Sequence, residues 1–330
     1  VMDSNDLERE RGITIYSKNC SIKYKGVKIN IVDMPGYFDF QGEMAQGMRA
    51  VDIATIVVCA ASGIQVGTEK AWDYCEKIKL PRAFFINKMD RENANFDKVL
   101  EQMKEKFGMS VVPIQYPIGK ESDFNGIINV ISKTALVYNA KTSKMETSEI
   151  PEDLKDKVEE CKQMVMEAVA ETDEELLDKY LNDGELCDED IYNGLIKGCA
   201  NGDIAPVLCG SAIKMIGIKS MINSIIKCFP SPEHSLPQKA INLSNDEEVF
   251  INIDDDKPFS AFVFKTIADP FVGKISLFRV MTGKISGEMT ALNTNKDKQE
   301  KLNHLFFMKG KNQIPTQVIS AGDIGAVAKL

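Results

Sequence analysis

The sequence predicts an α/β fold with a doubly wound sheet, an inserted α+β subdomain and a following β-barrel. Three observations predict it. Apolar, β-branched runs at residues 54–60, 82–86 and 205–209 alternate with helical stretches, as in a sheet that helices cover on both faces. The stretch at residues 108–203 is too long for a loop. Beyond residue 257 the chain changes to short strand-like runs separated by turns, which is typical of a barrel.

The first predicted elements are two antiparallel strands, because residues 13–24 and 27–32 alternate in polarity and meet at Lys25-Gly26. Helices are predicted at residues 43–51, from a Thr68 cap to Ile78, and from an Asn95 cap to Phe107. In the later part we expect strand-like pieces at 111–118 and 127–138, acidic helices at 151–171, 173–181 and 188–201, and a helix at 218–228. Three prolines within residues 230–237 indicate a linker.

These elements define the predicted domains. The α/β domain comprises residues 1–107 and 204–230, and the inserted subdomain comprises residues 108–203. A linker at residues 231–240 leads to the β-barrel at residues 241–330.

The composition is that of an ordinary soluble globular protein: 330 residues, 44% hydrophobic and 27% charged. No apolar run reaches the length of about 18 residues that a membrane span needs. The net charge of −9 argues against a non-specific coat on nucleic acid, although it leaves docking on RNA through a local basic face open. The 8 cysteines are scattered without a C-x-x-C pair, so we expect free thiols in a reducing cytoplasm rather than a zinc site.

Asp33-Met34-Pro35-Gly36 follows the predicted strand at residues 27–32. An aspartate at the end of a strand can hold Mg²⁺ through water, and the N–H of a nearby glycine can approach a terminal phosphate closely. The same four residues also make a good turn, because proline presets φ and glycine permits positive φ. The motif therefore needs partners elsewhere in the chain before it indicates a nucleotide site.

A second motif, Asn87-Lys88-Met89-Asp90, stands where another strand ends, and we expect it on the same sheet edge as Asp33. The Asp90 carboxylate can accept hydrogen bonds from the N1–H and 2-amino groups of guanine, which adenine does not offer. The Asn87 side chain can bridge the N7 side of the base to neighbouring loops, and the Lys88 stem can lie across the base face.

Ser211 and Ala212 lie at the next strand end, where their backbone N–H groups can meet the guanine O6. Any one of these motifs alone has an ordinary structural explanation, such as a polar helix start. Their order on successive strand ends favours a guanine-nucleotide site.

Thr14 follows Arg11-Gly12-Ile13. In such a site a loop threonine hydroxyl ligates Mg²⁺ only while the terminal phosphate is present. Taken by itself, Thr14 is better explained as a β-branched strand residue.

Together these motifs resemble the translational GTPases. The resemblance rests on residues 8–15, 33–36, 87–91 and 210–212. Residues 89–96 and the long insertion resemble elongation factor G in particular, and residues 269–274 are similar to the second domain of that family. The tetracycline ribosomal-protection proteins and the class II release-factor GTPase are relatives that these stretches resemble less well.

The resemblance implies a P-loop-GTPase-type sheet and a translation-factor barrel. It implies a cytoplasmic GTP hydrolase that uses GTP, GDP and Mg²⁺, binds the ribosome through rRNA and ribosomal proteins, and promotes tRNA–mRNA translocation, with no membrane and no DNA as partner. It also implies roles for site residues: Thr14 and Asp33 for Mg²⁺, Gly36 for the γ-phosphate, Tyr37 for the attacking water, and Asn87, Lys88, Asp90, Ser211 and Ala212 for guanine.

Two departures from the family pattern lead to a second functional class. The family has a histidine after the glycine, where this chain has Tyr37, as elongation factor G-like paralogues do. The sequence lacks the phosphate loop G-x-x-x-x-G-K-[ST], the strand before it and the later domains of the family. We therefore expect a fragment that alone binds GTP poorly and is inactive. We also expect apolar surface on the strands at residues 27–32 and 54–60 to remain exposed. The alternative function is a GTP-controlled ribosome-binding module with weak or no hydrolysis, or a ribosomal-protection-type protein.

Overall fold

The computed structural model describes residues 5–139, 141–142, 144–269 and 272–328. Contacts divide the chain into two compact units, one of residues 53–230 and one of residues 1–52 with 231–330. This division groups the N-terminal residues with the C-terminal strands, whereas the predicted domain boundaries group them with the α/β sheet. The predicted boundaries remain a prediction.

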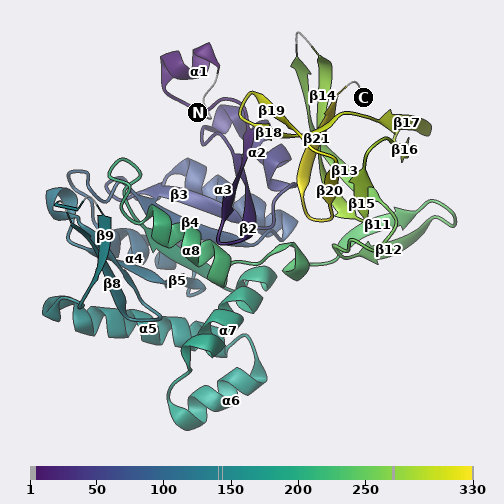
Figure 1. Ribbon diagram of the computed structural model, residues 1–330. Helices are drawn as coiled ribbons and strands as arrows, with labels where there is room; N and C mark the ends of the chain where they lie inside the picture. The colour runs from purple at the N-terminus through teal and green to yellow at the C-terminus, as the bar shows by residue number, and fades with distance from the viewer. Residues whose placement is uncertain (1–4, 140, 143, 270–271, 329–330) are drawn as a thin grey trace. The chain divides into compact units, whose positions relative to one another are not determined.

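The unit of residues 53–230 is built on a parallel sheet in the order β3-β4-β10-β5 (Figure 1). Its strands are β3 (Ala54–Cys59), β4 (Arg82–Asn87), β10 (Ala205–Cys209) and β5 (Val111–Pro113). The two central strands, β4 and β10, are buried along almost their whole length. This agrees with their uninterrupted apolar sequences, because helices cover both faces of a parallel sheet.

Helices α3 (Val66–Ile78), α4 (Phe96–Phe107) and α8 (Ile218–Cys228) pack on this sheet. The Trp72 ring of α3 stacks on Phe84 of β4 and on Phe107 of α4, with centroids 5.5 and 4.5 Å apart. Helix α8, drawn in front of the strands in Figure 1, adds Met221 and Ile225 to the same core. The predicted α/β architecture is confirmed.

The helix caps agree with the sequence in one case and differ in the other. Asn95 caps α4 as predicted, accepting a hydrogen bond from the N–H of Lys98. Helix α3 begins at Val66, two residues before the predicted cap, and its cap is Gln65. Thr68 instead lies in the first turn, where its hydroxyl accepts the N–H of Gln65 at 3.2 Å. Thr68 therefore completes a capping box from inside the helix.

The stretch predicted as an insertion forms an antiparallel sheet and three helices. The strands are β6 (Gln115–Ile118), β7 (Gly126–Asn129), β8 (Thr134–Asn139) and β9 (Lys144–Ser148), and the helices are α5 (Lys155–Ala170), α6 (Glu174–Asp183) and α7 (Asp188–Asn201). β5 also falls within residues 108–203, yet it pairs in parallel with β10 and so extends the central sheet. In the part of the chain that the structure describes, no helix is long and apolar enough to cross a membrane.

The other unit begins with α1 (Asp6–Arg11), the antiparallel pair β1 (Lys18–Tyr24) and β2 (Val27–Asp33), and α2 (Gln41–Met48). Strands β1 and β2 form a two-stranded sheet of their own. The structure thus differs from the expectation that Asp33 and Asn87 end strands of one sheet. The alternating residues of β2 fit a ribbon with one covered face, whereas strands buried on both faces carry continuous apolar runs.

Apolar side chains remain exposed on β2 and β3, the two strands for which the sequence predicts exposed apolar surface. Val27 and Ile31 on β2 are 41% and 39% exposed, and Val57 on β3 is 60% exposed. Strand β3 also forms one edge of its sheet. These exposures agree with the expectation.

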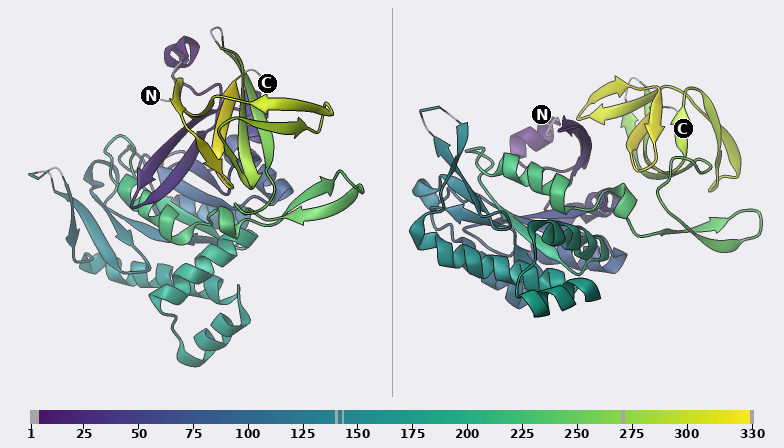
Figure 2. Two further views of the ribbon diagram at one scale, coloured as in Figure 1. Left: turned by 45° about the vertical axis from the view of Figure 1, so that its right-hand side comes forward. Right: turned by 60° about the horizontal axis from the view of Figure 1, so that its bottom comes forward.

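Strands β13 to β21 form the predicted barrel, which curls around a common interior in the right-hand view of Figure 2, whereas β11 and β12 form a hairpin beside it. The hairpin strands are β11 (Gln238–Asn242) and β12 (Glu247–Ile251). The barrel strands are β13 (Ser260–Asp269), β14 (Gly273–Thr282), β15 (Lys284–Ser286), β16 (Met289–Asn293), β17 (Lys298–Leu302), β18 (Leu305–Lys309), β19 (Asn312–Pro315), β20 (Val318–Ser320) and β21 (Ile324–Ala328). The main sheet has the order β13-β14-β21-β18-β19. Pro270 and Phe271 of the family-like stretch lie outside the described residues.

The N-terminal elements are bound to this barrel by polar contacts. Lys28 and Asn30 of β2 both donate to the carboxylate of Asp323, at 2.6 and 2.8 Å. The N–H of Gly310 donates to the carbonyl of Asn19 at 3.0 Å. β1, β2 and the barrel therefore form one packed body.

Candidate functional site

Asn87 is the last residue of β4, and its side chain connects two loops. The Asn87 Oδ1 accepts a hydrogen bond from the N–H of Lys88 at 2.7 Å and another from the N–H of Ala212 at 3.0 Å. The parallel pairing of β4 with β10 brings these strand ends side by side. Asn87 therefore links β4 to the loop at Ala212, while its predicted contact with the N7 side of a base remains a prediction.

The backbone of Met89 holds the same loop on both sides. Its N–H donates to the carbonyl of Gly210 at 3.2 Å, and its carbonyl accepts from the N–H of Glu121 at 2.9 Å. The Met89 side chain is fully buried in the core. Three loops are therefore fastened together around residues 87–90.

Lys88 and Asp90 are left available for a ligand. Lys88 is exposed and has a φ of 64°, in the left-handed region that non-glycine residues rarely adopt. Such strained positions gather at binding sites when the surrounding contacts hold them in place. The half-buried Asp90 carboxylate makes no hydrogen bond or ion pair within the described part of the chain, so it can accept donors from a base.

The backbone donors of Ser211 and Ala212 are already in use. The Ser211 N–H donates to the carbonyl of Ile216 at 2.9 Å, and the Ala212 N–H donates to Asn87. The structure thus differs from the expectation that both N–H groups are free for the guanine O6. The Ala212 N–H donates to a side chain, that of Asn87, and a base oxygen can take the place of that acceptor. The Ser211 N–H donates to a backbone carbonyl, and this bond closes the turn.

The Asp33–Gly36 segment leaves β2 and enters α2. Asp33 is the last residue of β2 and lies opposite Lys18 in the register of the β1–β2 ladder. Pro35 is buried, whereas Gly36 is exposed and has nothing within 4 Å of where a Cβ would stand. The Gly36 backbone is therefore open to close approach by a ligand.

The Tyr37 side chain is exposed. Tyr37 is 57% exposed and Phe38 is 54% exposed. Tyr37 precedes the short 3₁₀ turn Phe38–Phe40 with an extended backbone, at φ −78° and ψ 137°. Its ring is therefore not packed into an aromatic cluster and is available to solvent or a ligand.

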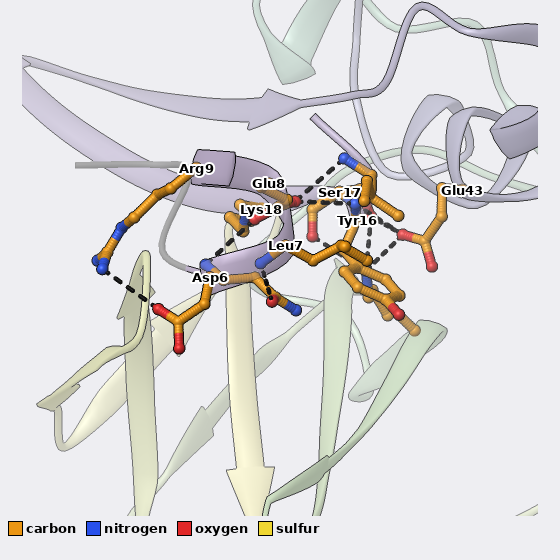
Figure 3. A network of polar contacts seen from close by, with 11 residues as sticks. Asp6, Leu7, Glu8, Arg9, Tyr16, Ser17, Lys18 and Glu43 are labelled. Atoms are coloured by element: carbon orange, nitrogen blue, oxygen red, sulfur yellow. Dashed lines mark hydrogen bonds and ion pairs between the residues drawn. The ribbon is translucent and has the colours of Figure 1, made fainter. Parts of the chain in front are cut away.

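The loop that carries Thr14 is organised by a buried carboxylate, that of Glu8, which is 1% exposed. Asn5 and Glu8 form a capping box at the start of α1. The Glu8 Oε1 also accepts the N–H groups of Ile15 and Tyr16, each at 3.1 Å, and Glu8 pairs with Lys18 (Figure 3).

Burial by itself raises the pKa of the Glu8 carboxyl, but hydrogen bonds from Lys18, Tyr16, Ile15 and Asn5 outweigh burial and lower the pKa to about 2. The sequence analysis assigned no role to Glu8. The spacing of Asn5 and Glu8 is the capping-box pattern, which is the signal that identifies this residue.

The side chains assigned to Mg²⁺ suit that ion chemically. Magnesium prefers oxygen ligands, and Thr14 and Asp33 offer a hydroxyl and a carboxylate, both half-buried. Thr14, Asp33, Gly36 and Tyr37 belong to the unit of residues 1–52 with 231–330. The residues assigned to guanine, which are Asn87, Lys88, Asp90, Ser211 and Ala212, belong to the unit of residues 53–230 and lie on two adjoining loops there.

Comparison with known proteins gives two family matches. Residues 1–231 match the family described as the elongation factor Tu GTP binding domain. Residues 258–330 match elongation factor G domain 2. A crystal structure of a protein from Thermus thermophilus is similar to this chain, with 28% sequence identity and a TM-score of 0.87. The similarity covers 99% of this chain and 46% of the Thermus chain, so this chain spans about half the length of that protein.

Proposed function

The chain belongs to the elongation factor Tu GTP-binding domain family, and its two matches make it an elongation factor G-like translational GTPase. From this premise we propose that it binds GTP and GDP with Mg²⁺. We propose further that it associates with the ribosome in the cytoplasm and promotes or modulates tRNA–mRNA translocation. Thr14 and Asp33 would hold the Mg²⁺, Gly36 would meet the γ-phosphate, and Tyr37 would face the attacking water. The ion itself would neutralise charge on the phosphates.

The proposal rests mainly on the structure of the loop at residues 87–90, which we expect to contact the base. Its Asp90 carboxylate has no partner in the described part of the chain, while Asn87 fixes the loop to Ala212. A carboxylate in this position discriminates by pairing with two donors at once, since guanine presents N1–H and a 2-amino group. An adenine base offers an acceptor at N1 and leaves the carboxylate unpaired, which is costly.

Equilibrium titration with GTP, GDP and ATP tests the base assignment. In the full-length protein we expect both guanine nucleotides to bind and ATP to bind at least about 100-fold more weakly, since a carboxylate left without its donors costs about 1–3 kcal/mol or more. Equal affinity for ATP and GTP would show that Asp90 does not read the base.

A second candidate function is favoured by Tyr37. A tyrosine stays neutral at pH 7, whereas a histidine can carry positive charge beside the developing charge on the γ-phosphate. The protein would then be a GTP-controlled ribosome-binding module whose hydrolysis is weak or absent. Ribosome co-sedimentation with a non-hydrolysable GTP analogue and with GDP, followed by single-turnover hydrolysis on ribosomes, separates the two functions. Analogue-dependent binding without turnover favours the module.

A further inference from the structure

Three consecutive backbone N–H groups after Thr14 donate hydrogen bonds to carboxylates. Those of Ile15 and Tyr16 donate to Glu8. The N–H of Ser17 and its hydroxyl both donate to the Oε2 of Glu43, at 2.7 and 2.8 Å. Glu43 lies on α2, the helix that comes after Gly36 in the chain, so the loop of Thr14 and α2 share one hydrogen-bonded cluster (Figure 3).

A barrel lysine completes this cluster. The Lys265 ammonium of β13 donates to the Ser17 carbonyl at 2.9 Å, to the Ser17 hydroxyl at 2.9 Å and to Glu43 Oε2 at 2.5 Å. An ammonium has three donors, and these contacts use all of them. The Lys265 and Glu43 side chains are 7% and 22% exposed, so the charge of each is balanced mainly by the other.

We propose that Glu43 and Lys265 are positioning residues that fasten the Thr14 loop at Ser17 to both α2 and the barrel. Ser17 stands three residues after Thr14, so fixing its N–H, carbonyl and hydroxyl restricts where the Thr14 hydroxyl lies. This inference rests on the proposed role of Thr14 as a Mg²⁺ ligand. Because such a threonine serves the ion only while the γ-phosphate is present, loosening the loop weakens GTP·Mg²⁺ more than GDP·Mg²⁺.

The chain supplies a matched control in a second buried ion pair. Arg279 of β14 pairs with Asp52, and their side chains are 6% and 20% exposed. Arg279 also donates to the carbonyl of Ala50 at 3.3 Å. This pair joins a different part of the N-terminal segment to the barrel and, within the described part of the chain, makes no hydrogen bond or ion pair with Ser17, so its loss removes a comparable charge pair without touching the Thr14 loop.

Amide hydrogen exchange of Lys265→Met and Arg279→Met, without nucleotide, tests the fastening directly. Exchange at residues 15–17 should accelerate about tenfold or more in Lys265→Met and stay within about twofold of the parent in Arg279→Met. Lys265→Arg, which keeps the charge, should restore part of the protection. Equal acceleration in both methionine variants, or none in either, overturns the fastening. If Lys265→Met does not fold, Glu43→Gln tests the same cluster from α2.

Titration of the full-length protein and its variants with GTP·Mg²⁺ and GDP·Mg²⁺ tests the positioning role. The ratio of the two affinities should shift against GTP by about fivefold or more in Lys265→Met, which corresponds to a coupling of ordinary size, and should not shift in Arg279→Met. An unchanged ratio despite faster exchange overturns the role in positioning Thr14. If the full-length parent binds neither nucleotide, the proposed function fails, while the exchange experiment still decides whether Glu43 and Lys265 fasten the loop.

Discussion

The Oδ1 of Asn87 accepts the backbone N–H of Ala212 at 3.0 Å, across 125 residues of sequence. Asn87 is the last residue of β4 and Ala212 follows β10, the adjacent parallel strand, and the stretch predicted as an insertion lies between them in the chain. This one amide oxygen also accepts the N–H of Lys88. The loop that carries Asp90 is therefore held in place by a hydrogen bond between Asn87 and a loop that is distant in the sequence.

Replacing Asn87 with alanine should release both loops. Two backbone N–H groups lose their acceptor, so we expect the free energy of unfolding to fall by about 1–3 kcal/mol and guanine-nucleotide binding to weaken. Urea unfolding followed by Trp72 fluorescence reports on this unit, since Trp72 is the one tryptophan of the chain. Asn87→Asp keeps the acceptor oxygen and serves as the control. An alanine variant as stable as the aspartate variant would mean that the bridge contributes nothing.

The sequence predicted elements well where the local signals agree with each other. Helix α7 was predicted at residues 188–201 and spans Asp188–Asn201. Three acidic residues occupy its first turn and Gly202 ends it in the left-handed conformation, so both ends carry a local signal. The guanine motif was likewise placed at the end of a strand, because an apolar run led directly into it.

The sequence failed where a distant side chain takes the backbone hydrogen bonds. Residues 13–24 alternate as a strand, but β1 begins only at Lys18. The N–H groups of Ile15 and Tyr16 are bound by Glu8, and that of Ser17 is bound by Glu43, so none can join a ladder. Likewise, no pattern near Ala212 shows that Asn87 accepts its N–H.

In the full-length protein, Asp90→Asn should weaken GTP binding and relax the preference for guanine. The change turns one acceptor into a donor that faces the 2-amino group of the base, and the loss of two charge-assisted hydrogen bonds costs about 2–4 kcal/mol. Calorimetric titration with GTP and ITP measures it, because inosine lacks the 2-amino group. The parent should prefer GTP, and the variant should lose that preference. A variant that binds GTP as the parent does would refute the assignment of Asp90.

Glu8 should make stability depend on pH in the acid range. Its pKa is lowered from 4.5 to about 2 in the folded chain, so its stabilising contribution is complete above pH 4.5 and is lost as the pH falls toward 2. The stability advantage of the parent over Glu8→Gln should therefore shrink by about 2 kcal/mol between pH 6 and pH 3.

Urea unfolding followed by circular dichroism at several pH values measures the Glu8 effect. Glu10→Gln, at an exposed position of the same helix, is the control and should show no such trend. An advantage that stays constant down to pH 3 would mean that the Glu8 carboxylate is not held in its charged form.

In the full-length protein, Tyr37→His should accelerate GTP hydrolysis on the ribosome. Tyr37 follows Gly36, is 57% exposed and is not packed against the core, so the substitution removes little buried surface and should leave stability and GTP affinity nearly unchanged. A histidine can orient the attacking water and carry positive charge beside the γ-phosphate, whereas the tyrosine hydroxyl is neutral and reaches further. A group of this type contributes about 10²–10³ in rate, so single-turnover hydrolysis on ribosomes should rise by up to that factor. Tyr37→Phe is the control and should be no faster than the parent, because it adds neither a charge nor a donor. A histidine variant that hydrolyses GTP no faster than the parent would show that position 37 does not limit the chemistry.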